Sequence, residues 1–297
     1  MNRELAPVVL FTYNRPEHTK KTLEALTNNY LASDSILYVF SDAARNEKDE
    51  KKVEEVREVI SHIEGFKKVE CILQVNNKGL ANSIIDGVSK IIAKHKKVIV
   101  LEDDLITSKM FLYFMNDALD TYKSREQIWS ISGYHPPITL PSTYKESVYL
   151  SFRGSSWGWA TWADRWNTID WNTENYKYFL LHPLDVYKLS RGGCNLVKML
   201  QDCINKKNNS WAVRSCYAQA LQDRYTVYPT KSLVKSIGTD GSGTNFTLME
   251  KRFDCEIQNC FLYDLKSNIA PNPTVIKVFK SFFDISIVRY LKRKIRR

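Results

Sequence analysis

The chain has 297 residues, a formal net charge of +10 and a hydrophobic fraction of 43%. That length allows one large domain or two small ones, and the apolar fraction is ordinary for a globular protein. No apolar run approaches the ~18–20 residues that cross a bilayer. The N-terminal region lacks a signal-peptide pattern, and the six cysteines form no C-x-x-C pair, so we expect a cytoplasmic protein with reduced thiols.

The positive charge is concentrated at the C-terminal end. Residues 277–297 contain eight Lys or Arg and one acid, which leaves 35 bases and 32 acids in residues 1–276. A nearly neutral body argues against nucleic-acid binding. A basic end instead indicates contact with an anionic surface through that end alone.

Apolar strands alternate with helices through the first part of the chain. This alternation predicts an α/β fold with a mostly parallel central sheet flanked by helices. The first helix should begin at Pro16. Val53 and Val56 give the second helix an apolar face, and Gly65 should end that helix. Strands are expected over residues 6–11, 35–44, 68–75 and 96–101, and helices over 16–30, 49–65 and 80–95.

The pattern changes after residue 125. Residues 155–171 contain five Trp, and a helical region is expected over roughly 184–223. A short strand follows at 225–229, and then a glycine-rich loop at 238–245. The last segment, 274–297, has the apolar spacing of a helix.

Polar clusters follow each of the four predicted strands, and the ligands of parallel sheets bind at the carboxyl ends of strands. The clusters are residues 12–15, 41–45, 76–80 and 102–104. The last is "EDD", and three adjacent carboxylates repel one another unless a positive group is present. Mg²⁺ and Mn²⁺ prefer oxygen ligands and often bind one or two carboxylates together with phosphates. We therefore expect a divalent metal there, although a solvated strand end is the alternative for this triplet alone.

Five segments resemble the GT-A-fold glycosyltransferases, in particular the N-acetylglucosaminyltransferase group that begins complex N-glycans. They are "VVLFTYNRPEHTKKTLEAL", "NNKGLANSI", "VIVLEDDL", "FLYFMNDAL" and "GSSWGWATW", in the order found in that family. A sixth, "LVKSIGTDGSGTN", is similar to segments of bacterial surface-polysaccharide sugar transferases. The resemblance implies a GT-A type fold, a nucleotide-sugar donor, and Mn²⁺ or Mg²⁺ bound by Asp104.

The resemblance also implies roles for individual residues. Asp104 would hold the metal and act in catalysis, and the glycine-rich loop would close over the donor. For Thr12 and Asn14 the alternative is that they only shape the turn before Pro16, and for Lys78 that it is a solvated surface residue. For the glycine-rich segment the alternative is an ordinary surface loop, and for the tryptophans it is packing in the core. The residues expected to bind the nucleotide-sugar are Thr12, Asn14, Arg15, Asp42, Lys78, Gly79, Glu102, Asp103 and Ser242, and those expected to bind substrate are Trp157, Gly158, Trp211 and Arg214.

The catalytic base departs from the pattern of the family. In the animal enzymes a Trp is followed by two acids, the second of which is the base, whereas Ala212 and Val213 follow Trp211 here. Neither side chain can accept a proton. Asp240 in the glycine-rich loop is the first candidate for the base, and the remaining candidates are Asp164, Asp202 and Asp223.

We therefore expect a glycosyltransferase that moves a sugar from a nucleotide-diphosphate donor, such as a UDP-sugar, to a saccharide or lipid-linked acceptor in bacterial envelope polysaccharide synthesis. A nucleotidyltransferase and a non-catalytic sugar-binding protein are the alternatives. Residues 1–272 would form the catalytic domain, with a donor half (1–125) and an acceptor half (126–272). Residues 273–297 would form a basic amphipathic tail on the inner face of the cytoplasmic membrane, or a helix packed on the domain.

Overall fold

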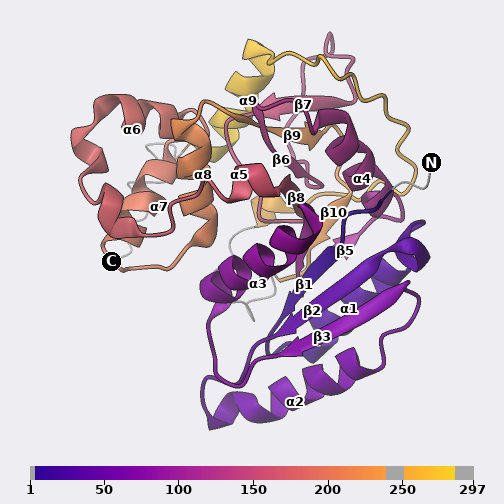
Figure 1. Cartoon of the computed structure of the whole chain (residues 1–297). Helices are drawn as coiled ribbons and strands as arrows, with labels where there is room; N and C mark the ends of the chain where they lie inside the picture. Colours follow the sequence, from indigo (N-terminus) through magenta and orange to yellow (C-terminus); the bar gives the residue numbers. More distant parts are fainter. Residues whose placement is uncertain (1–3, 239–250, 285–297) are drawn as a thin grey trace.

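The computed structural model describes residues 4–238 and 251–284. Its centre is an eight-stranded sheet with helices on both faces (Figure 1). Four neighbouring strands are parallel, and antiparallel β8 joins them to the rest of the sheet. The order along the sheet is β3 (Lys68–Leu73), β2 (Ile36–Ser41), β1 (Val8–Thr12), β4 (Lys97–Glu102), β8 (Trp159–Trp162), β6 (Ile128–Ser132), β9 (Tyr225–Pro229) and β7 (Val148–Ser151).

The helices divide between the two faces of the sheet. Alternate residues of β1 point to opposite faces, so Val8 and Leu10 pack with α1, α2 and α4, and Val9 and Phe11 pack with α3, α5 and α8. Burial on both faces explains why β1 reads as a continuous apolar run. The helices are α1 (Pro16–Thr27), α2 (Glu47–Ser61), α3 (Leu80–His95), α4 (Phe111–Tyr122), α5 (Ala163–Trp166), α6 (Pro183–Ser190), α7 (Asn195–Ile204), α8 (Trp211–Leu221) and α9 (Pro273–Phe283).

The predicted α/β class and mostly parallel sheet are confirmed, as are all four early strands and the bounds of α3. The predicted end of α2 is wrong, because the helix ends at Ser61 rather than near Gly65. The Ser61 hydroxyl donates to the carbonyl of Glu58 at 2.8 Å, and the ring of His62 contacts the same oxygen at 3.0 Å. These local side-chain bonds compete with continuation of the helix.

The helical region expected over 184–223 consists of three helices, since Gly192 and Gly193 separate α6 from α7, and residues 205–210 separate α7 from α8. Two short antiparallel strands, β5 (Leu105–Thr107) and β10 (Val234–Ser236), form a second sheet that the sequence analysis missed. No helix within the described ranges is long and apolar enough to cross a membrane.

The segment predicted as a C-terminal helix is described only as far as Asp284. Within it, α9 buries Val275, Phe279 and Phe283, and Phe279 packs against Tyr149 and Tyr228. For this part of the segment the structure favours the packed alternative over an apolar face directed at lipid. Residues 285–297 lie outside the described residues.

Candidate active site

The four predicted polar clusters meet at one edge of the sheet. In the parallel register Thr12 lies beside Ser41, Phe11 beside Glu102, and Ser41 beside Leu73. The residues that follow these strands therefore emerge side by side at their carboxyl ends. This is the edge where parallel sheets bind ligands.

Arg15 links two carboxylates of the acidic triplet. Its guanidinium pairs with Asp103 and lies 3.2 Å, through Nη1, from Oδ2 of Asp104. Asp103 is buried and also accepts a hydrogen bond from the Tyr13 backbone N–H at 3.4 Å. The side chain of Asp104 is 17% exposed, against 5% for Asp103. Asp103 is thus held from within the protein, and Asp104 remains the more accessible of the two.

The triplet carries more negative charge than Arg15 neutralises. Burial first, and then the charges of Asp104 and Asp103, raise the pKa of Glu102 to about 8. Burial raises the pKa of Asp103 even though Arg15 opposes that shift. Burial lowers the pKa of Arg15, but the charges of Asp103 and Asp104 outweigh it and the pKa rises. An additional cation would relieve this repulsion.

The donor set fits a divalent cation that is shared with a ligand. Among the residues that the structure describes, no three His, Cys, Asp or Glu side chains are arranged to enclose an ion. Mg²⁺ and Mn²⁺ commonly take one or two carboxylates and complete their shell with phosphate oxygens and water. The accessible Asp104 suits a site of this kind, in which the protein supplies few of the oxygen ligands.

The start of the glycine-rich loop lies directly against Asp104. Strand β10 pairs with β5, and the Ile237 N–H donates to the carbonyl of Asp104 at 2.8 Å. A Cβ on Gly238 would lie 2.1 Å from Oδ2 of Asp104 and 3.1 Å from Nη1 of Arg15. A larger residue at this position would therefore displace the Asp104 carboxylate. The predicted base Asp240 and the predicted donor contact Ser242 lie outside the described residues.

Asp42 fastens the loop that precedes α3. Its carboxylate accepts hydrogen bonds from the backbone N–H groups of Ala43, Lys78 and Gly79, each at 2.9 Å. Gly79 has φ +72° and caps α3, a conformation that favours glycine. The Lys78 ammonium lies 2.7 Å from Asp86 at the surface. Three predicted nucleotide-binding residues thus form one unit, and their contact with a nucleotide stays a prediction.

Asp49 on α2 holds the turn after β1, and the sequence analysis missed it. It accepts from the Tyr13 hydroxyl at 2.9 Å and from the Asn14 amide at 2.8 Å. Thr12 is buried, and its hydroxyl lies 3.5 Å from the carbonyl of Phe40. The sequence signal that could have indicated Asp49 was the group of acids in the first turn of α2. Acids are favoured at that end of any helix by the helix dipole, so they do not by themselves indicate a site.

Trp157 and Gly158 lie at the same edge as the triplet, because Trp159 pairs with Val100 of β4. Gly158 has φ +57°, and a Cβ there would lie 2.9 Å from Cε2 of Phe111. Packing therefore requires this glycine. The Trp157 ring meets Tyr134 edge-on at 4.7 Å, and contact of this pair with a sugar stays a prediction.

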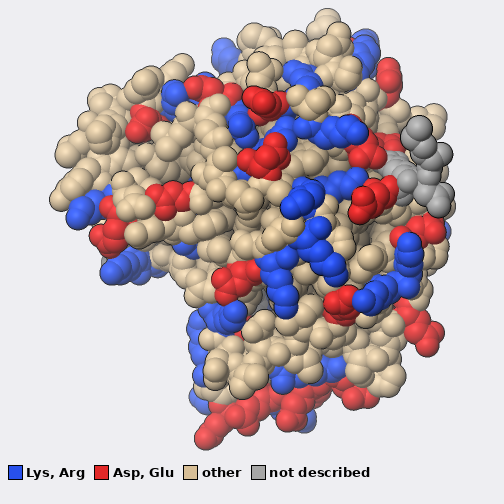
Figure 2. Space-filling model, viewed as in Figure 1, with Lys and Arg blue, Asp and Glu red and all other residues tan. Residues whose placement is uncertain are grey.

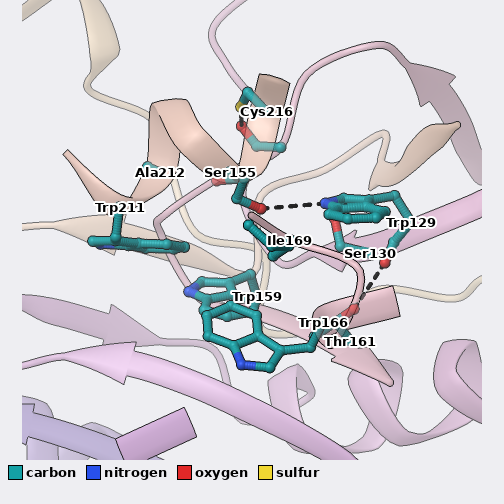
Figure 3. A pocket seen from close by; sticks show the side chains of 12 residues that line it. Trp129, Ser130, Ser155, Trp159, Thr161, Trp166, Ile169, Trp211, Ala212 and Cys216 are labelled. Carbon is teal, nitrogen blue, oxygen red and sulfur yellow. Dashed lines mark hydrogen bonds between the residues drawn. The ribbon is translucent and has the colours of Figure 1, made fainter. Parts of the chain in front are cut away.

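Trp211 belongs to a layer of tryptophans on the face of the sheet covered by α3 (Figure 3). Its ring stacks on Trp159 at 5.0 Å, and Trp159 stacks on Trp166 at 5.6 Å. The cavity beside them has a volume of about 20 Å³, the space of about one water molecule, so it does not hold a sugar ring in this conformation. Ala212 lines this cavity.

Arg214, the other residue predicted on α8 to bind substrate, is buried in the same layer. Its guanidinium donates to the carbonyl of Trp171 at 2.9 Å and to Asn209 at 2.8 Å. The bond to Trp171 joins α8 to the segment before α6, and the bond to Asn209 holds the connection between α7 and α8. Substrate contact by Trp211 and Arg214 stays a prediction.

The three alternative candidates for the base are engaged in ion pairs. Asp164 pairs with Arg165, Asp202 pairs with Lys198, and Asp223 lies 2.6 Å from Lys188. Because β8 is antiparallel and Trp162 pairs with Lys97, the first residue of β4, Asp164 lies at the edge of the sheet opposite the triplet. That position removes Asp164 from consideration as the base.

Comparison with known proteins finds distant similarity to solved structures alone. No protein-family model and no curated protein matches the chain. The chain is similar to S. aureus TarS with a TM-score of 0.36 and 12% identity, over 52% of this chain and 28% of that chain. For mannosyltransferase PcManGT from Pyrobaculum calidifontis, in complex with GDP-Man and Mn²⁺, the TM-score is 0.38 and the identity 10%, over 74% and 77%.

A third solved structure is the galactosyltransferase LgtC in complex with donor and acceptor sugar analogs. The TM-score is 0.38 and the identity 8%, over 71% of this chain and 69% of that chain. The chain spans little more than a quarter of TarS. Scores of this size place the chain in no family, so the functional argument depends on the site itself.

Proposed function

We propose that the protein is a metal-dependent glycosyltransferase of GT-A type that moves a sugar from a nucleotide-diphosphate donor to a saccharide or lipid-linked acceptor. The observation that carries this proposal is the setting of Asp104. It is an accessible carboxylate at the carboxyl edge of the parallel strands, between Arg15 and Gly238. The resemblance of six sequence segments to sugar transferases supplies the reaction class.

The residues around Asp104 would bind and orient the donor. Arg15 holds Asp103 and Asp104 in place, and Asp42 fixes the loop of Lys78 and Gly79, which would lie beside the nucleotide. Thr12, Asn14 and Glu102 would complete that side of the site. When bound at Asp104, Mn²⁺ or Mg²⁺ would neutralise charge on the leaving nucleotide diphosphate.

Transfer also needs a group that takes a proton. The acceptor oxygen bonds to the anomeric carbon, the bond from that carbon to the diphosphate breaks, and the acceptor proton passes to a base. Asp240 is our candidate, because it lies two residues after Gly238, which touches Asp104. Replacement of Asp240 by Asn should lower turnover strongly and leave donor affinity nearly unchanged.

The acceptor is proposed to belong to bacterial envelope polysaccharide, because residues 233–245 resemble surface-polysaccharide transferases. A UDP-sugar is the first donor to test. A lipid-linked acceptor would bring the protein to the inner face of the cytoplasmic membrane, where the basic residues of 277–297 would contact anionic lipid. The catalytic unit would then combine a donor half (1–125) and an acceptor half.

The experiment measures hydrolysis of a panel of nucleotide-sugars with Mn²⁺, with Mg²⁺ and with EDTA. We expect slow hydrolysis of one donor that requires the metal and is lost in Asp104→Ala. The matched control is Asp164→Ala, which removes a carboxylate from the opposite edge of the sheet. Equal donor binding with and without metal, measured by calorimetry, would refute the metal role, and pyrophosphate release from nucleoside triphosphates would favour a nucleotidyltransferase.

A further inference from the structure

One short segment exposes an unusual amount of apolar surface. Among the described residues, twelve large hydrophobic side chains are exposed, and five of them lie within residues 178–187. Scattered exposed apolar side chains are normal, but a contiguous group marks a surface that meets a partner. We call this group the α6 patch: Tyr178 is 62% exposed, Leu180 48%, Leu181 75%, Leu184 63% and Tyr187 63%.

The α6 patch is separate from the core that α6 already covers. Phe179 and Leu189 point inward and pack in one cluster with Tyr217 of α8. The patch therefore consists of outward side chains from the turn at Phe179–Leu181 and from α6. Figure 1 shows α6 and α7 in a lobe that projects away from β1–β3, and Figure 2 shows much of that lobe as uncharged surface.

The surroundings of the α6 patch are cationic. Residues 177–207 contain six Lys or Arg and two acids, a net charge of +4. Three of these cations are paired with acids, since Lys188 and Arg191 bind Asp223 and Lys198 binds Asp202. Within the part of the chain that the structure describes, the other three, Lys177, Lys206 and Lys207, form no ion pair. The Lys177 ammonium lies 5.1 Å from the centre of the Tyr178 ring. The lobe thus presents Leu and Tyr side chains among positive charges.

The basic C-terminal segment departs from this same lobe. The Asp284 carboxylate accepts a hydrogen bond from the Cys194 N–H, at the start of α7, at 2.7 Å. The Arg153 guanidinium lies 4.1 Å from the centre of the Phe283 ring just before it. The next thirteen residues, 285–297, contain six Lys or Arg and no acid. The basic sequence of residues 285–297 therefore begins directly after a residue that is bonded to this lobe.

We propose that the α6 patch inserts into the surface of an anionic lipid bilayer. Leucines with interspersed tyrosines and cations suit the boundary between headgroups and acyl chains, where the tyrosine hydroxyls and the ammonium groups stay hydrated. The net positive charge of the lobe disfavours a second copy of the lobe as its partner. Anionic headgroups complement the charge of the lobe and that of the basic sequence that follows Asp284. The proposal extends the proposed function, in which the acceptor is lipid-linked.

The test is co-sedimentation of the full chain with vesicles of phosphatidylcholine alone or mixed with phosphatidylglycerol. Leu181→Ser combined with Leu184→Ser should lower the affinity for the mixed vesicles by at least about tenfold at every salt concentration, because transfer of leucine to lipid does not depend on screening. Arg293→Glu combined with Lys294→Glu should lower it mainly at low salt. The matched control is Leu262→Ser, since Leu262 is 98% exposed but lies outside the lobe.

Wild-type binding by the double leucine variant would overturn the proposal, as would an equal loss in the Leu262→Ser control. Leu181→Ser alone, which should show a smaller loss, guards against misfolding of the double variant. Light scattering that shows a dimer for the wild type and a monomer for the variant, without a difference in vesicle binding, would assign the patch to self-association instead. Nucleotide-sugar hydrolysis without vesicles separates the two proposals, since it tests the active site and is independent of the patch.

Discussion

Nη1 of Arg15 lies 3.2 Å from Oδ2 of Asp104, while the same guanidinium pairs with the more deeply buried Asp103. One cation from the turn after β1 therefore organises two carboxylates at the end of β4. Substitution of the two acids should have different effects, because Asp103 is buried whereas Asp104 is partly exposed.

Asp103→Ala should lower the free energy of unfolding by about 3 kcal/mol, because it leaves Arg15 partly buried without its main partner. Asp104→Ala should change stability by less than about 1 kcal/mol, since Arg15 keeps Asp103. Urea denaturation measures both values. Metal-dependent donor binding should nevertheless be lost in Asp104→Ala. The reverse order of stability would show that Asp104 is the structural partner.

Gly238→Ala should weaken metal and donor binding by about tenfold or more, because the new Cβ would meet the Asp104 carboxylate and displace it. The stability should change little, since the end of a side chain can turn away. Gly65→Ala is the matched control, because Gly65 has φ +83° and a Cβ there would lie 2.6 Å from Thr27. The Gly65→Ala variant should lose stability, measured by thermal unfolding, and keep its donor affinity, measured by calorimetry. Unchanged affinity in Gly238→Ala would separate this segment from the metal site.

Asp42→Ala should lower stability by about 2–3 kcal/mol, because three backbone N–H groups lose their acceptor. Amide exchange at Lys78 and Gly79 should accelerate at the same time. Asp86→Ala breaks only the surface pair with Lys78 and should cost less than about 0.5 kcal/mol. Similar exchange rates at Lys78 in the two variants would contradict the role of Asp42 as the anchor of the loop.

His135 should make the stability of the protein sensitive to mild acid. Burial lowers the pKa of His135 to about 4, and its Nδ1 lies 3.1 Å from the Tyr149 hydroxyl. The unfolded chain binds a proton near pH 6.5, whereas the folded protein does not until about pH 4. The contribution of His135 to stability should therefore be constant above pH 6.5 and fall by roughly 3 kcal/mol between pH 6.5 and 4. Glu102, whose pKa is raised to about 8, contributes in the opposite sense, so the effect of His135 is the difference between the wild type and a His135 variant.

His135→Gln should be less stable than the wild type at pH 7.5 but should lose much less stability on acidification. Urea denaturation at several pH values measures this slope. His62→Gln replaces an exposed histidine and should keep the slope of the wild type. If His135→Gln and the wild type lose stability in parallel between pH 6.5 and 4, another group is responsible.

The parallel half of the fold could be read from the sequence because each element carries a local signal. β1 is apolar on both faces, Pro16 starts α1, and α3 has a strong apolar face. A parallel sheet also aligns its carboxyl ends, so the convergence of Asp42 with the acidic triplet followed from the element order alone. Short strands such as β5 and β10 depend on pairing between residues about 130 positions apart. No local sequence pattern predicts such a pairing.

The detailed use of each side chain was less predictable. Whether Asp42 accepts from a nucleotide or from its own backbone depends on the path of the loop at Lys78, which the residue types do not specify. The Trp-rich segment illustrates the same limit. The spacing of its tryptophans does not show that Trp159 stacks on Trp211 of α8 in the interior, whereas Trp157 lies at the edge of the site. Asp49 was missed because an acid near a helix start needs no further explanation.

The hydrogen bond between Asp284 and Cys194 has a practical consequence for handling the protein. A chain shortened to residue 272 would remove α9 and expose Tyr149 and Tyr228, which Phe279 covers. A chain that ends at Asp284 would keep that cover, together with the link to α7. Removal of the basic segment without damage to the fold therefore calls for a stop codon after Asp284, and comparison of the two shortened proteins would separate loss of membrane contact from loss of folding.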